Sequence, residues 1–113
     1  MKKIGYRIRT KEEQERYPGT LQPTLNGVDI DLVKWSRLSL IANQKRGILT
    51  FEFILVKNLI SDKSIRFSID EQFKLKIFAL DGEEIEGITA ASISFDLNNI
   101  PRMEISVIVE VNQ

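Results

Sequence analysis

The sequence predicts an all-β domain, a sandwich or barrel of about eight or nine short antiparallel strands. Two observations carry this prediction. Apolar side chains alternate with polar ones through most of the chain, which is the period of a β-strand. A pattern also repeats at an offset of 55 residues, because Leu25-Asn26-Gly27 returns as Leu80-Asp81-Gly82.

The repeat continues beyond these turns. At the same offset Leu38 and Leu40 return as Ile93 and Phe95. At an offset of 54 the alternating residues of the next segment match, namely Phe51, Phe53 and Leu55 with Ile105, Val107 and Val109. The matches predict two copies of a strand–turn–strand unit, over residues 25–57 and 80–111, within a single domain of residues 1–113.

The N-terminal part is expected to form one strand and a long connection. Ile4, Tyr6 and Ile8 alternate with basic residues, which predicts a strand with one solvated face. Thr10–Gly27 has no such alternation, and its polar Lys11–Arg16 stretch could form one or two helical turns. We expect this segment to be a surface connection over the sheet, although loops of this length are also often functional.

The remaining alternating segments predict strands over residues 28–33, 35–42, 48–57, 65–69, 73–77, 88–97 and 101–111. Residues 48–57 are apolar on both faces, with Phe51 on one face and Ile54 on the other. This pattern is typical of a central or covered strand. Pro101 stands at the start of the last strand, where a missing N–H does least harm.

The composition limits the classes of function that this chain can have. The chain has 113 residues, of which 42% are hydrophobic and 28% charged, as in an ordinary soluble domain. Its 16 basic and 16 acidic residues cancel, which argues against general nucleic-acid or membrane-surface binding. No apolar run approaches the roughly 20 residues that span a bilayer. No apolar stretch follows Met1-Lys2-Lys3, so a signal peptide is not expected.

The chain contains neither cysteine nor histidine. Thiol catalysis, thiolate metal sites and histidine-dependent acid–base mechanisms are therefore excluded. The acidic stretch Asp81–Glu86 fits no calcium-loop spacing and is interpreted as solvated turn carboxylates. We expect a protein that is not an enzyme and has no catalytic residues, cofactor or metal.

The single tryptophan, Trp35, marks a candidate interface. If Leu38 and Leu40 face the core, strand alternation turns Trp35 to the outer side, together with Val33. The candidate interface residues are Trp35, Arg37, Ile41, Ile54 and Val56. An outer apolar patch with tryptophan and arginine has the composition of an interface centre, unless the long segment Thr10–Gly27 covers it.

Four basic residues are candidates for binding a small anionic ligand: Arg7, Arg9, Lys45 and Arg46. The first two lie on the expected N-terminal strand, and the last two in a turn. The alternative is a charged strand edge, which discourages aggregation and binds nothing.

The second half carries a resemblance. Its residues Ser92-Ile93-Ser94-Phe95-Asp96-Leu97 and Ile100-Pro101-Arg102-Met103-Glu104-Ile105 resemble those of small β-rich proteins encoded by bacteriophages. The resemblance implies a virion component or an accessory protein acting in the bacterial host cytosol.

Two functions follow as hypotheses. The first is a non-enzymatic module that self-associates or binds a protein partner through the outer face around Trp35. The alternative is an anti-defence inhibitor or sponge, which would bind a host immune protein or a small anionic nucleotide signal.

Overall fold

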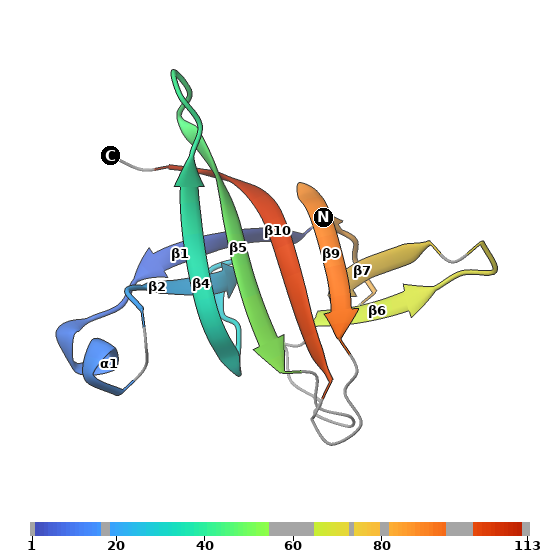
Figure 1. Cartoon of the computed structure of the whole chain (residues 1–113), viewed down its shortest axis with the longest axis horizontal. Helices are drawn as coiled ribbons and strands as arrows, with labels where there is room; N and C mark the ends of the chain where they lie inside the picture. The colour runs from blue at the N-terminus through green and yellow to red at the C-terminus, as the bar shows by residue number, and fades with distance from the viewer. Residues whose placement is uncertain are drawn as a thin grey trace.

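The computed structural model describes residues 2–16, 19–54, 65–72, 74–79, 82–94 and 101–111. It confirms the all-β class, because two four-stranded sheets pack together as a sandwich (Figure 1). The back sheet has the order Val28–Asp29 (β3), Leu21–Leu25 (β2), Lys2–Ile8 (β1) and Ile85–Glu86 (β8). The front sheet has the order Val33–Leu40 (β4), Arg46–Ile54 (β5), Arg102–Glu110 (β10) and Ile88–Ser94 (β9).

Two further elements complete the described part of the chain. Ile65–Ile69 (β6) and Leu75–Ala79 (β7) form a separate hairpin, and Lys11–Arg16 forms a short helix, α1. In Figure 1, β1 and β2 run across the back of the front-sheet strands, which is the arrangement of orthogonally packed sheets. No helix among the described residues is long and apolar enough to cross a membrane.

The core lies between the sheets and follows strand alternation. Every second side chain of β5 and β10, including that of Phe51, points into the core. The back sheet contributes the side chains of Ile4 and Leu25 to the same core. The largest side chains that are fully enclosed are Phe51, Leu49, Met103, Ile105, Val107 and Pro23. The apolar alternation in the sequence therefore identified the inner face of the central strands.

The front sheet has a local two-fold relationship. Phe51 on β5 lies opposite Ile105 on β10, which is its equivalent in the sequence repeat. The outer strands β4 and β9 flank this pair on either side. The pairing of each outer strand skips one residue, Lys34 on β4 and Thr89 on β9, and these two are also equivalents.

The skipped residue on β4 corrects one prediction. Alternation without a break would place Val33 on the outer face with Trp35, but the bulge at Lys34 shifts the phase. Val33 consequently lies opposite Phe53 and packs against the core.

The expected surface connection over Thr10–Gly27 was wrong in its second half. Residues 21–25 form β2, which lies between β1 and β3 in the back sheet and is mostly buried. The sequence does not show the apolar–polar alternation of a strand here, because the buried residues Gln22, Pro23 and Thr24 are not large apolar ones. The expectation of antiparallel strands also needs one correction, because β1 and β8 pair in parallel.

Candidate functional site

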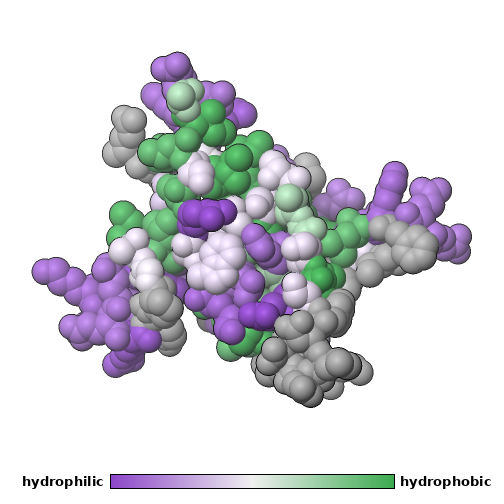
Figure 2. Space-filling view, in the orientation of Figure 1, coloured by the Kyte–Doolittle hydropathy of each residue, from purple (hydrophilic) through white to green (hydrophobic). Residues whose placement is uncertain are grey.

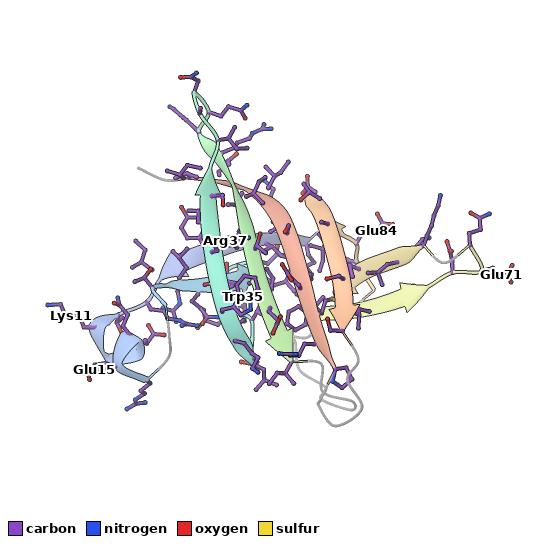
Figure 3. The ribbon with its side chains drawn as sticks, viewed as in Figure 1. Lys11, Glu15, Trp35, Arg37, Glu71 and Glu84 are labelled. Atoms are coloured by element: carbon purple, nitrogen blue, oxygen red, sulfur yellow. The ribbon has the colours of Figure 1, made fainter. Side chains whose placement is uncertain are left out.

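The outer side of the β4-β5-β10-β9 sheet, here called the front face, is the side seen in Figure 2, and it contains the tryptophan (Figure 3). Trp35 and Arg37 lie two residues apart on β4 and therefore share this face. The Arg37 guanidinium carbon lies 5.9 Å from the centre of the Trp35 ring, which is a cation–π contact. Trp35 is half-buried and Arg37 is exposed.

Polar side chains of the central strands surround this pair. Glu52 lies opposite Trp35, and Thr50 lies opposite Arg37. The hydroxyl groups of Thr50 and Ser106 are 2.9 Å apart and form a hydrogen bond across β5 and β10. Arg102 Nη1 donates to Glu52 Oε1 at 3.4 Å. The central floor of the front face is thus polar, with its side chains fixed by cross-strand contacts.

The other candidate interface residues are spread along the sheet. Ile54 ends β5 at one end of the front face, whereas Ile41 follows β4 at the opposite end, where its N–H donates to the carbonyl of Arg46. Val56 lies outside the described residues. The structure therefore brings Trp35 and Arg37 together but separates them from Ile41.

The outer patch is less apolar than its composition suggested. On the front face the exposed large apolar side chain is Ile108 of β10, which is 41% exposed near the hairpin end of β4 and β5. Leu40 is on the inward side of β4, but it lies at the end of that strand beyond the core and is 71% exposed. Figure 2 shows green apolar atoms in that upper region and purple polar atoms around the centre and lower edge. Trp35 is consequently an aromatic residue in a polar surrounding, not part of an apolar stripe.

The segment expected as an alternative cover does not lie over this face in its described part. It forms α1 and β2, and β2 belongs to the back sheet. Ser36, which faces inward on β4, donates through its hydroxyl to the carbonyl of Leu21 at 2.9 Å. This contact holds β2 against the inner side of β4, opposite the Trp35 side.

Arg7, a candidate anion ligand, is held by two carboxylates of the chain itself. Its Nε and Nη2 donate to Asp29 at 2.9 and 2.7 Å. Its Nη1 and Nη2 donate to Glu13 at 2.8 and 2.6 Å. An incoming anion would have to displace one of these paired contacts, so Arg7 is better suited to fixing α1 and β3 on β1.

Glu13 also caps α1. Its carboxylate accepts the N–H of Thr10 at 3.0 Å, and the Thr10 hydroxyl accepts the N–H of Glu13 at 3.3 Å. This reciprocal pair is a capping box, and the spacing Thr10-x-x-Glu13 is readable in the sequence. Hydrogen bonds from Arg7 and Thr10 lower the pKa of Glu13 to about 2. The polar helix is thus anchored by hydrogen bonds in place of an apolar stripe.

The lowered pKa predicts an acid-sensitive attachment of α1. Because the ordinary pKa of 4.5 falls to about 2 on folding, the ionised Glu13 stabilises the native state above about pH 4.5. This contribution is lost as the pH falls through 4.5 towards 2. We expect Glu13→Gln to lower stability near neutral pH and to flatten the pH dependence in this window. Urea unfolding between pH 2 and 7 tests this, and parallel curves for both proteins would contradict it.

Arg9, the second candidate, is 5% exposed and has an internal structural role. Its Nη2 donates to Gln22 Oε1 at 3.0 Å. Gln22 Nε2 in turn donates to the carbonyls of Pro23 and Ile30, at 3.0 and 2.9 Å. The N–H of Ile30 donates to the Pro23 carbonyl, but proline has no N–H to return this bond. Gln22 supplies the missing donor, and Arg9 orients it.

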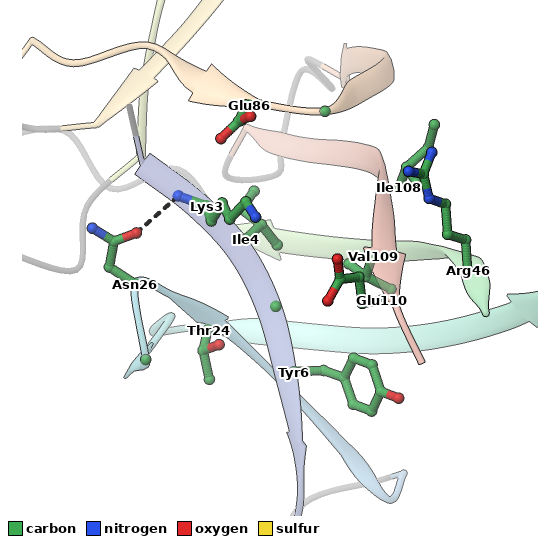
Figure 4. Close-up of a pocket in the computed structure, with 13 residues that line it drawn as sticks. Lys3, Ile4, Tyr6, Thr24, Asn26, Arg46, Glu86, Ile108, Val109 and Glu110 are labelled. Atoms are coloured by element: carbon green, nitrogen blue, oxygen red, sulfur yellow. Dashed lines mark hydrogen bonds between the residues drawn. The ribbon is translucent and has the colours of Figure 1, made fainter. Parts of the chain in front are cut away.

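Lys45 and Arg46, the last two candidates, lie at the β4–β5 hairpin, far along the chain from Arg7. Arg46 borders a groove of about 490 Å³ between β1 and the end of β10 (Figure 4). The groove also contains Lys3 and two carboxylates, Glu86 and Glu110. Its charges are balanced, and neither Arg7 nor Arg9 borders it, so the structure does not gather the four basic candidates into one anion site.

Neither a metal centre nor a relative identifies the site. Within residues 2–16, 19–54, 65–72, 74–79, 82–94 and 101–111, no three acidic side chains gather as metal ligands would. Comparisons with protein-family models, curated proteins and solved structures found no match to this chain.

Proposed function

We propose that this protein is a non-enzymatic interaction module that binds a protein partner through the front face. The observation that supports the proposal most is the Trp35–Arg37 pair, which lies on a sheet face that no described element covers. Tryptophan and arginine are the residue types that most often dominate binding energy in protein interfaces.

The surroundings of this pair fit a protein partner. Two basic side chains, Arg37 and Arg102, share the face with two acidic ones, Glu52 and Glu104. A balanced set of charges favours neither polyanions nor a charged membrane surface. The cross-strand contacts already order several of these side chains, which lowers the entropy lost on binding.

We expect Trp35→Ala to weaken partner binding by about 2 kcal/mol, or roughly 30-fold. Ser39→Ala is the matched control, because Ser39 lies exposed on the same face of the same strand. The partner can be isolated by cross-linking in bacterial lysate and its affinity then measured by calorimetry. Since Trp35 is the only tryptophan, a shift of its fluorescence on binding would report contact at the front face directly.

Other results would contradict the proposal. A purified partner that binds wild type and Trp35→Ala equally, without changing the tryptophan fluorescence, would place binding elsewhere. Self-association through the same face has a different signature, because Trp35→Glu would then turn an oligomer into a monomer in sedimentation. The resemblance to phage proteins supports a first search among bacterial host and virion proteins.

A further inference from the structure

The two outer strands of the front sheet, β4 and β9, are equivalent in the repeat, but their side chains protect them differently against pairing with another strand. At the repeat offset of 55, the β4 residues Lys34, Trp35 and Arg37 correspond to Thr89, Ala90 and Ser92 of β9. Every charged or bulky side chain of that set is thus replaced by a small neutral one. Lysine and other charges on an edge strand discourage strand addition, so β4 is protected and β9 is not.

Among the described residues, β9 pairs only with β10, along its inner edge, so no described strand occupies its outer edge. A strand edge presents a row of backbone N–H and C=O groups, whose complement is another extended backbone. Thr89, Ala90, Ser92 and Ser94 are all exposed.

A groove of about 640 Å³ adjoins this edge. It is lined by β9 on one side and by β6, β7 and β8 with the turn before β8 on the other, and no β10 residue borders it. Its apolar lining residues are Leu75, Ile77, Ile85, Ile88, Ala90 and Ala91, and its charged ones are Lys76 and Glu84, one of each sign. An added strand alternates its side chains, so every second one would point towards this groove.

We infer that β9 accepts an extended peptide segment of a partner protein, which adds a fifth strand to the front sheet. The segment needs small apolar residues at alternate positions, facing the groove. It needs no charge opposite β9, because that strand carries none. This surface is separate from the Trp35 pair, which lies on the opposite outer strand of the sheet.

The fold favours a single strand over a second copy of the whole chain. Figure 1 shows the β6–β7 hairpin projecting past β9 on the side of its free edge. A complete second sandwich approaching that edge would meet the hairpin, whereas one extended segment can lie between the hairpin and solvent.

The test uses a nine-residue peptide of alternating threonine and valine with lysine at both ends. The control is the same peptide N-methylated at every second residue along the edge that would pair, which removes the backbone donors and keeps the side chains. Hydrogen exchange of the intact protein, resolved by residue, gives the readout. At saturating peptide we expect exchange of alternate β9 amides to slow about tenfold or more.

The β4 amides serve as the internal control and should not change. Equal protection of β4 and β9, or no protection of β9 at millimolar peptide, would overturn the inference, as would equal binding of the methylated peptide. Sedimentation gives a further outcome that overturns it: a wild-type dimer that Ser92→Lys separates and Ser39→Lys does not would show that a second copy occupies this edge. None of these results depends on Trp35, so the two proposals can fail independently.

Discussion

Phe51→Ala is expected to cost about 3–5 kcal/mol of folding free energy, the largest loss of any substitution considered for this protein. Phe51 is fully enclosed, lies opposite Ile105 at the centre of the front sheet, and has its ring centre 5.8 Å from that of Phe53. Removing the ring leaves a cavity that both sheets border. Since a domain of this size has about 5–15 kcal/mol of stability in total, the variant should be largely destabilised but measurable in urea.

Ile48→Ala is the matched control, because Ile48 lies on the same strand but on the front face, where it is only half-buried. We expect it to cost about 1 kcal/mol. A ratio near one between the two losses would contradict the structure, since it would mean that the front face is as enclosed as the core. The comparison therefore tests the core and the openness of the proposed binding face together.

Gln22→Leu is expected to lower the free energy of unfolding by about 1–3 kcal/mol, the second largest loss. The substitution keeps the approximate size of the side chain but removes the donor to the Ile30 carbonyl and the acceptor for Arg9. These groups are in a buried part of the back sheet, so lost hydrogen bonds are not fully replaced by water. The loss is measurable by urea or thermal unfolding.

Pro23→Ala distinguishes this mechanism from simple loss of packing. Alanine restores the backbone N–H, which can return the bond to the Ile30 carbonyl. In the wild type we expect Pro23→Ala to destabilise, because buried ring atoms are lost and the unfolded chain gains freedom. With Gln22→Leu already present, the same change should cost clearly less or should stabilise. Strict additivity of the two changes in a double-mutant cycle would disprove the proposed compensation.

Parts of the site were predictable from the sequence, and parts were not. The pairing of Trp35 with Arg37 follows from their spacing on one strand. The capping box was also visible, because Thr10 and Glu13 have the required residue types and separation. The partners of Arg7 and Arg9 were not predictable, since Asp29 and Gln22 reach them only after β2 and β3 pair beside β1.

The sequence by itself determined the all-β class and the inner face of the central strands, because backbone geometry sends successive side chains of any strand to opposite sides. It could not determine where that alternation breaks. The bulge at Lys34 returns Val33 to the core, and the buried polar residues of β2 hide a strand of the back sheet. Both features depend on the neighbouring strand that lies alongside, so only the tertiary structure decided them. The same holds for the contrast between the protected edge of β4 and the bare edge of β9, which exists only once the strand order is fixed.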